Sequence, residues 1–261
     1  MTYFDSHAHY YDSRFEEEQE GGADALLSRL LSESVSHIVN VGTAPDTCAL
    51  AVMQAKRYKN MYTALGIHPS DARLVENMDA AIADVYSLIK NAESKCVALG
   101  EIGLDYHYPD TDREMQHRFF RAQMELAREL DIPVVIHDRD SHEDVMRVIR
   151  EYRGVRGILH SFSGSAEMAR ELVSMDYMIS FSGTLTFTNA RRPKEVAAIL
   201  PHSSVLIETD APYLAPHPLR GTLNHSGNLE YTNRTLAAIF GMDEAECAAL
   251  TTENAKRIFR L

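Results

Sequence analysis

The segment Tyr3-Phe4-Asp5-Ser6-His7-Ala8-His9 decides the fold prediction, because a short apolar run ends there in two histidines separated by one residue. Alternate side chains of an extended strand project to the same side, so both imidazoles can reach one metal ion. Polar ligands that follow several strands in this way are typical of a metal site at the mouth of a barrel.

The rest of the chain repeats the pattern of a short apolar run followed by a segment with helical periodicity. Met115 to Leu130, for example, places an apolar stripe beside charged neighbours. Regular alternation of strand and helix predicts right-handed crossovers and a parallel sheet. Eight such strands favour an α/β fold closed as a TIM-type (β/α)8 barrel. The predicted strands are Tyr3 to His7, His37 to Val41, Met61 to Ile67, Cys96 to Glu101, Pro133 to His137, Gly157 to His160, Tyr177 to Phe181 and Ser204 to Glu208.

Length and composition agree with this fold. The chain has 261 residues, of which 45% are apolar, and a barrel of this type needs about 250 residues. A polar loop from Ala211 to Asn228 and helices over Leu229 to Phe240 and Asp243 to Phe259 are expected after the last strand. We find no low-complexity linker, so we predict a single hydrolase domain over residues 1–261.

The N-terminal sequence and the cysteines indicate the compartment. No basic segment followed by an apolar stretch opens the chain, and no run approaches the roughly 20 apolar residues of a membrane span. Cys48, Cys96 and Cys247 are far apart and predict buried or half-buried free thiols rather than disulfides or a zinc site. We therefore expect a cytoplasmic protein without a membrane partner and without a stable protein partner.

The net charge of -12, from 38 acidic and 26 basic residues, limits the substrate. Proteins that coat duplex nucleic acid usually present a broad basic face. Any polyanion must here be held locally by metal ions and a few cations. DNA ends or a small phosphoester suit this charge better than a long duplex.

Strand ends supply a set of side chains suited to metal binding. Four imidazoles and two carboxylates are enough for two divalent ions about 3.5 to 4 Å apart. Glu101 is the natural bridge between the ions, since its strand faces both sides of the mouth. Such a mixed set suits Zn, Mn, Fe or Ni, and also Mg where carboxylates dominate. The candidate ligands are His7, His9, Glu101, His137, His160 and Asp210.

Six sequence blocks spread over nearly the whole chain closely resemble the TatD-type metal-dependent deoxyribonucleases of the amidohydrolase-like superfamily. They are His7-Ala8-His9, Gly66-Ile67-His68-Pro69, Gly100-Glu101-Ile102-Gly103-Leu104-Asp105-Tyr106, Pro133-Val134-Val135-Ile136-His137, His160-Ser161-Phe162-Ser163-Gly164 and Glu208-Thr209-Asp210-Ala211-Pro212-Tyr213-Leu214. The resemblance implies a TIM-type barrel, two divalent ions held by the six candidate ligands, and phosphodiester hydrolysis, often from a 3′ end of single-stranded DNA. It also implies that Glu101 and Asp210 are catalytic, with Asp210 accepting a proton from the attacking water.

Four further residues are candidates for supporting roles. His68 and Arg139 each follow a strand and offer a donor to a phosphate oxygen. Asp105 and Glu208 are expected to hold ligand imidazoles in one tautomer. Arg139 has an alternative role on a solvated loop, where it would pair with Asp138 or Asp140. Asp210 has the alternative of capping the turn before Pro212.

Two segments depart from the family pattern, and three function classes remain open. Tyr11 stands where the family usually has Asp or Asn, and Arg220 to Ser226 replaces a loop that usually reads R-G-K-x-N-E-P. The leading class is a divalent-metal 3′-5′ deoxyribonuclease. The alternatives are a binuclear hydrolase of a small phosphoester, ester or amide, and a metal-holding barrel that binds a partner without turnover. The loops, not the shared ligands, separate the first two classes.

Overall fold

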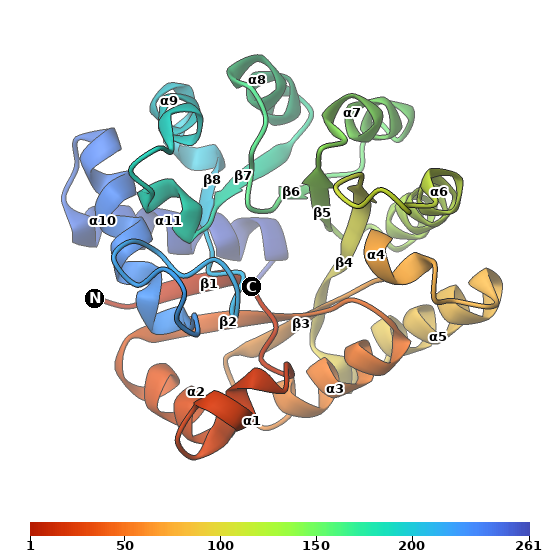
Figure 1. Cartoon of the computed structure of the whole chain (residues 1–261), viewed down its shortest axis with the longest axis horizontal. Coiled ribbons are helices and arrows are strands. Elements are labelled where there is room, and N and C mark those ends of the chain that lie inside the picture. Colours follow the sequence, from red (N-terminus) through yellow and green to blue (C-terminus); the bar gives the residue numbers. More distant parts are fainter.

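The computed structural model describes residues 1–261 and contains one sheet of eight parallel strands in the order β1 to β8. The strands alternate with helices, so the predicted TIM-type (β/α)8 fold is confirmed (Figure 1). The strands are β1 (Tyr3–Ala8), β2 (Val35–Gly42), β3 (Met61–Leu65), β4 (Cys96–Asp105), β5 (Val134–Arg139), β6 (Gly157–Leu159), β7 (Tyr177–Phe181) and β8 (Val205–Ile207).

Each predicted strand overlaps an observed one, and β4 differs most from its prediction. It runs on to Asp105, and its register with β5 shifts between Leu99 and Ile102. Glu101 therefore lies within this strand and not at its end, where the sequence pattern had put it. The run of apolar residues ends at Glu101, but the backbone pairing with β5 continues and buries the next residues as well.

Helices surround the strands. They are α1 (Arg14–Glu18), α2 (Gly22–Glu33), α3 (Pro45–Ala55), α4 (Pro69–Ala72), α5 (Met78–Lys90), α6 (Arg113–Leu130), α7 (His142–Glu151), α8 (Ala166–Ser174), α9 (Arg191–Ile199), α10 (Leu229–Phe240) and α11 (Glu244–Phe259). Short 3-10 turns are η1 (Ala92–Ser94), η2 (Gly183–Thr186), η3 (His202–Ser204) and η4 (Ser226–Asn228). None of the helices combines the length and the apolar character needed to cross a bilayer.

The barrel closes where β1 meets the end of β8. A parallel bridge joins Ala8 to Ala211, the His9 amide donates to the Ala211 carbonyl at 2.6 Å, and the Asp210 amide donates to the His7 carbonyl at 2.9 Å. These bonds continue the sheet beyond the last residue of β8. They fix Asp210 beside His7, which lies in β1, and His9, which follows it.

Apolar side chains fill the barrel interior, and α11 covers the end of the barrel at which the strands begin. Phe4, Val39, Val135 and Leu206 belong to one buried cluster together with residues from the C-terminal half of α11. The ring of Phe259 stacks on that of Phe4 at 5.9 Å. In Figure 1 the C-terminus accordingly lies near the middle of the ring of strands. The amino-terminal ends of the strands are therefore sealed, which leaves the opposite end open for a site.

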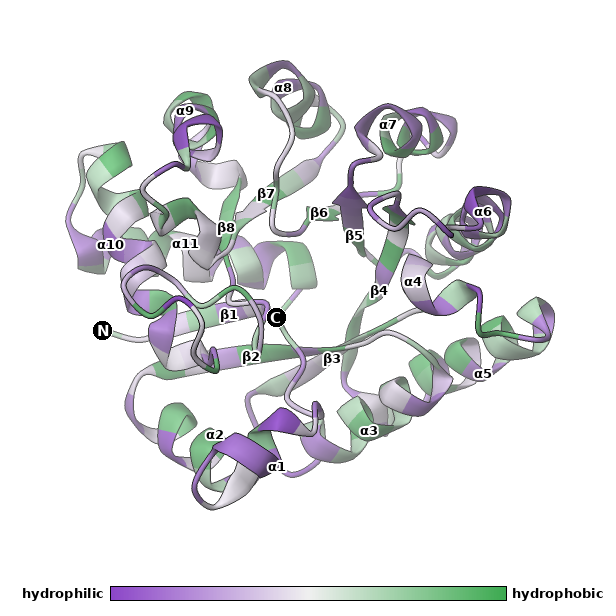
Figure 2. Cartoon of the chain, viewed as in Figure 1, coloured by the Kyte–Doolittle hydropathy of each residue, from purple (hydrophilic) through white to green (hydrophobic).

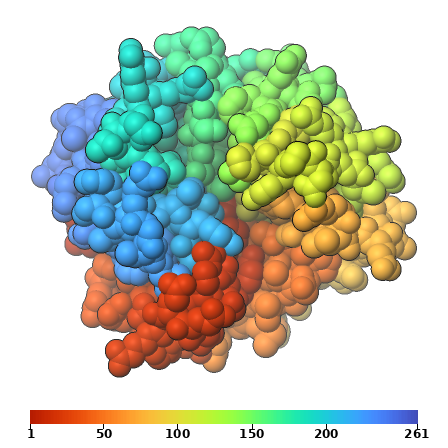
Figure 3. Space-filling model, in the orientation of Figure 1, coloured from red at the N-terminus to blue at the C-terminus, as the bar shows by residue number.

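The carboxyl-terminal end of the barrel is hollowed. Figure 2 shows that β5 becomes hydrophilic toward its end, although the strands are otherwise mostly apolar. Figure 3 shows a hollow on this face, between the blue segment after β8, the red N-terminal segment and the yellow segment after β4. Polar residues at this end of the barrel have no apolar layer above them, so they remain available to a ligand.

Candidate metal centre

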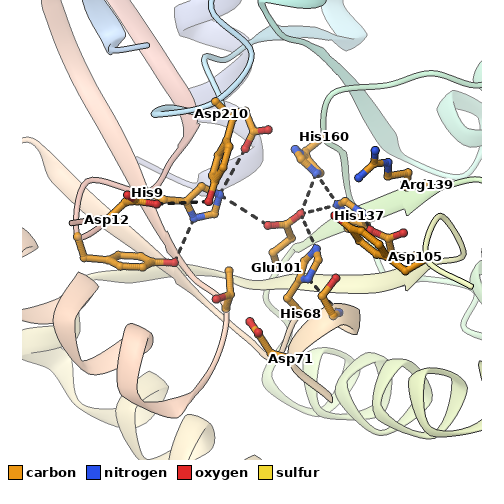
Figure 4. A pocket seen from close by; sticks show the side chains of 15 residues that line it. His9, Asp12, His68, Asp71, Glu101, Asp105, His137, Arg139, His160 and Asp210 are labelled. Atoms are coloured by element: carbon orange, nitrogen blue, oxygen red, sulfur yellow. Dashed lines mark hydrogen bonds and ion pairs between the residues drawn. The ribbon is translucent and has the colours of Figure 1, made fainter. Parts of the chain in front are cut away.

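The four imidazoles among the six candidate ligands converge on the carboxylate of Glu101, which is only 3% exposed. Its Oε2 atom lies 3.4 Å from His7 Nε2 and 3.8 Å from His9 Nε2. Its Oε1 atom lies 2.8 Å from His137 Nδ1 and 2.8 Å from His160 Nε2. The two oxygens thus face different pairs of imidazoles, as Figure 4 illustrates for His9, His137 and His160.

Asp210 completes the side of the cluster nearest β1. Its Oδ1 atom lies 3.3 Å from His9 Nε2 and 3.6 Å from His7 Nε2, and the two Nε2 atoms are 3.1 Å apart. The backbone of Asp210 has a φ of 56°, a left-handed conformation that aspartate tolerates better than most residues. This turn directs the carboxylate into the mouth, and its side chain stays 15% exposed.

Three of the imidazoles donate a hydrogen bond away from the cluster. His9 Nδ1 lies 2.7 Å from the Val41 carbonyl, which can only accept. His160 Nδ1 lies 3.1 Å from Glu208 Oε1, and His137 Nε2 lies 3.2 Å from Asp105 Oδ2. These partners fix the tautomers, so in its neutral form each ring turns a lone pair toward Glu101 or Asp210.

This donor set fits divalent cations. Nδ1 of His137 and Nε2 of His160 lie 3.1 Å apart, and both contact Glu101 Oε1. Lone pairs held this close repel one another unless positive charge lies among them. Nδ1 of His7 is also buried without a hydrogen-bond partner. Imidazole nitrogen and carboxylate oxygen in this arrangement are the ligand types of Zn and similar ions.

The electrostatics favour charged carboxylates in the cluster. Burial acts to raise the pKa of Glu101, but while the imidazoles are protonated and hold no metal ion, the charge on His160 and the hydrogen bond from His137 outweigh it and keep the pKa well below its usual value. Burial likewise opposes ionisation of Asp210, yet the hydrogen bond from His9 keeps its pKa below the usual value. Both carboxylates are therefore ready to bind a cation at neutral pH.

His68 contacts the same cluster from the N-cap position of α4, with its Nε2 atom 3.5 Å from Glu101 Oε1. Its Nδ1 atom accepts a hydrogen bond from the Ser70 amide. Burial lowers the pKa of His68 to about 3, so the ring is neutral and its proton must sit on Nε2. His68 is therefore a donor to an oxygen at the centre, whereas the six candidate ligands offer lone pairs.

An open cleft of about 430 Å³ lies above the cluster. Arg139 lines it, but its exposed side chain lies outside the group of side chains that meet at Glu101. Arg139 pairs with neither neighbouring carboxylate: Asp138 binds His142 at 2.7 Å, and Asp140 binds His107 at 3.2 Å.

The lining residues that sequence reasoning had not selected as candidates are Tyr11, Asp12, Thr43, Ser70, Asp71, Tyr108 and Tyr213. Most lie on loops after strands, and only Tyr213 stands inside one of the quoted sequence blocks.

The family follows from comparison with known proteins. The family model described as "TatD related DNase" matches residues 4–260. The chain belongs to the TatD-related DNase family. It is 40% identical over 264 residues to a Bacillus subtilis protein named as the uncharacterized metal-dependent hydrolase YabD, with 99% of each chain covered. It is 33% identical to the Escherichia coli protein YcfH, likewise named as an uncharacterized metal-dependent hydrolase, with 100% of this chain and 97% of the relative covered.

Solved structures of TatD-type proteins share the fold. The crystal structure of YJJV, a TatD homologue from Escherichia coli, superimposes with a TM-score of 0.89 at 28% identity, covering 99% of this chain and 98% of that one. A crystal structure of a TatD-family hydrolase from Entamoeba histolytica has a TM-score of 0.86 at 20% identity, covering 99% and 98% of the two chains, which bears on the fold alone. As a TatD-family member the protein is a metal-dependent hydrolase, and its His, Glu and Asp groups are suited to metal binding.

The two departures from the TatD pattern have different locations. Tyr11 lines the cleft with its hydroxyl 3.2 Å from His9 Nδ1. The Arg220 to Ser226 loop instead supports the segment that follows β8, because Asn224 Nδ2 donates to the Thr209 carbonyl at 2.9 Å. His225, which replaces a loop glutamate, accepts from the Gly227 amide within its own turn. Tyr11 is thus the departure that a substrate would meet first.

Proposed function

We propose that this TatD-family hydrolase is a two-metal phosphodiesterase, acting as a 3′-5′ exodeoxyribonuclease on single-stranded DNA. The observation that supports it best is the division of Glu101 between two groups of imidazoles in a buried cluster below an open cleft. His7, His9 and Asp210 would hold one ion. His137 and His160 would hold the other, and Glu101 would bridge the two.

Two divalent ions in this position would activate a water molecule and neutralise charge on the phosphate. Asp210 remains ionised and partly exposed next to His9, so it is suited to accept the proton of that water. The water oxygen bonds to phosphorus while the bond from phosphorus to the 3′ oxygen breaks. His68, with its proton on Nε2, donates to a phosphate oxygen that approaches Glu101.

Asp105 and Glu208 act as positioning residues in this proposal. Glu208 is fully buried and also accepts from the Ser161 amide at 2.8 Å, so it cannot rotate away from His160. Asp105 is 2% exposed and accepts from the His107 amide at 2.9 Å, which fixes it against His137. Both carboxylates keep an imidazole lone pair directed at the centre.

The charge around the cleft favours one alternative, a small phosphoester, ester or amide as substrate. Asp12 and Asp71 both line the cleft, and the whole chain has a net charge of -12. Carboxylates at the entrance repel a polyanion at long range and leave a small substrate largely unaffected. This alternative uses the same ligands.

A panel of model substrates tests the proposal. We expect hydrolysis of bis-p-nitrophenyl phosphate with a divalent ion, and little or none of p-nitrophenyl acetate or N-acetyl amides. Glu101→Ala should lose both bound metal and activity, whereas Glu195→Ala, on exposed α9, should keep both. A Glu101→Ala variant with full metal content and full rate would contradict the ligand assignment. Faster turnover of the acetate or the amides would favour the alternative.

A further inference from the structure

The cleft above the candidate metal centre continues into a groove on each side, and the two grooves have opposite chemistry. The first, the β6–β7 groove, shares His160, Arg139 and Tyr213 with the cleft and runs past Ser163 and Thr184. The second, the β4 groove, shares Ser70 and Tyr108 with the cleft and runs past Arg73, Asp110 and Asp112. The candidate metal centre thus lies between two paths that a chain-like substrate could follow.

The β6–β7 groove is suited to an anion. Arg139 has no carboxylate partner, since Asp138, which also lines the groove, is paired with His142, and Asp140 is paired with His107. The hydroxyls of Ser161, Ser163 and Thr184 line the same groove. The buried Ser182 lies behind them, with its Oγ 2.9 Å from Ser161 Oγ and 3.0 Å from Thr184 Oγ1. A guanidinium without a carboxylate partner, beside hydroxyl donors, is a common arrangement for binding phosphate.

The β4 groove repels an anion. Its one arginine, Arg73, is already paired with Asp110 at 3.1 Å, and Asp112 adds a further carboxylate that caps α6 through the Met115 amide. Asp71 lies at the junction of this side with the cleft. In Figure 4 Asp71 and Arg139 lie on opposite sides of Glu101. A second phosphate is therefore favoured on one side of the metal centre and disfavoured on the other.

We propose that the β6–β7 groove is a subsite for the phosphate adjacent to the scissile one, with Arg139 as its cation, so that a polynucleotide leaves the centre on this side only. The proposal rests on the proposed phosphodiesterase function and adds direction to it. A strand whose backbone extends to both sides would bring phosphate against Asp110 and Asp112. Only a terminal nucleotide, with its sugar and base and no further phosphate, suits the β4 side. The ring of Tyr108 is half-exposed there, with Arg139 Cζ 5.8 Å from its centroid, and offers a surface for stacking. Cleavage at chain ends follows from this asymmetry.

Two isomeric dinucleotides test the asymmetry. The 5′-phosphorylated and 3′-phosphorylated forms of thymidylyl-thymidine carry equal charge but place the extra phosphate on opposite sides of the diester. Their dissociation constants are measured by calorimetry in the Asp210→Asn background, which suppresses cleavage, with the unphosphorylated dinucleotide as reference. We expect one isomer alone to bind more tightly than the reference, by about tenfold, the usual effect of one charge-assisted hydrogen bond. The other isomer should bind no more tightly than the reference.

Arg139→Ala and Arg73→Ala are matched variants. The first removes the arginine of the β6–β7 groove, and the second removes the arginine of the β4 groove. Arg139→Ala should abolish the preference between the isomers, and Arg73→Ala should leave it intact. Equal binding of the two isomers, or loss of the preference in Arg73→Ala, would overturn the subsite. The parallel assay of bis-p-nitrophenyl phosphate with the wild-type protein separates the two proposals. A clear isomer preference without any diester hydrolysis would leave the phosphate subsite standing and remove the phosphodiesterase function.

Discussion

Nδ1 of His137 and Nε2 of His160 lie 3.1 Å apart, and the other nitrogen of each ring contacts a carboxylate, Asp105 for His137 and Glu208 for His160. The outer carboxylates orient two lone pairs toward the same point. Such an arrangement has a cost in the absence of a cation, and binding of a cation relieves it. Several measurable properties of the protein depend on this relationship.

Metal should stabilise the folded protein. An ion that binds only the folded state adds about 2.7 kcal/mol of unfolding free energy at a free concentration 100 times its dissociation constant. We expect the melting temperature to fall on treatment with a chelator and to recover with Zn or Mn. His142→Gln, which alters a histidine that binds Asp138 outside the cluster, should show the same recovery. A wild-type melting temperature that changes with neither the chelator nor the metal would contradict a metal centre.

Glu208→Gln should weaken metal binding without removing a candidate ligand. The amide can present its NH₂ group to His160 Nδ1 and so disturb the tautomer that the carboxylate enforces. Changes to such outer partners typically lower metal affinity by about 10- to 100-fold. Competition with a chromophoric chelator measures this affinity. Asp138→Asn is the control, since Asp138 binds Ser141 and His142 and neither is a candidate ligand. Equal affinities in wild type and Glu208→Gln would show that Glu208 has no positioning role.

Asp5→Ala should destabilise the barrel at its closure. Asp5 is fully buried, and its carboxylate accepts from Thr209 Oγ1 and from Ser226 Oγ, each at 2.6 Å. Removing it leaves these buried donors unsatisfied, at a cost of about 1–3 kcal/mol for each group that cannot find another partner. Urea denaturation measures the loss. Asp5→Asn, which keeps one acceptor oxygen, should lose less stability, and equal stability of Asp5→Ala and wild type would contradict this role.

His37 should make the stability of the protein depend on pH. Burial lowers the pKa of His37 below its unfolded value of 6.5, and the ring stacks on Phe4 at a centroid distance of 5.0 Å. The unfolded state therefore binds more protons, so this contribution is full above pH 6.5 and is lost as the pH falls from there toward the folded pKa. The unfolding free energy is measured against pH for the wild type and for His37→Phe, and the difference between the two profiles gives the contribution of His37. A flat difference between pH 5 and 8 would rule it out.

Much of the fold was predictable because its signals are local. Each strand of the barrel is a short apolar run, and α10 has the predicted bounds Leu229–Phe240. The convergence of His7, His137 and His160 also follows from local patterns, since the ends of parallel strands meet at one mouth. The predicted end of the fourth strand at Glu101 was wrong. The strand β4 continues to Asp105 because it pairs with β5, and this pairing depends on a segment distant in sequence.

The cleft beyond the ligands was less predictable. Asp71 lines it from α4 and Tyr108 from the loop after β4, and neither has a sequence pattern that indicates its position in space. The neutral state of His68 could not be predicted from the sequence either, because it depends on the Ser70 amide and on burial. The two possible partners of Arg139 were visible in the sequence, but only the structure shows that both bind histidines instead.

We propose that this TatD-family protein cleaves DNA from its 3′ end with metal and Asp210. The most direct test follows single-stranded DNA oligomers labelled at the 3′ or the 5′ end. Metal-stripped protein is resupplied with Mg, Mn or Zn, and Asp210→Asn serves as the control. We expect stepwise loss of the 3′ label that requires both the metal and Asp210. Two tightly bound ions per chain without cleavage under any condition would contradict the claim and favour a small-molecule hydrolase.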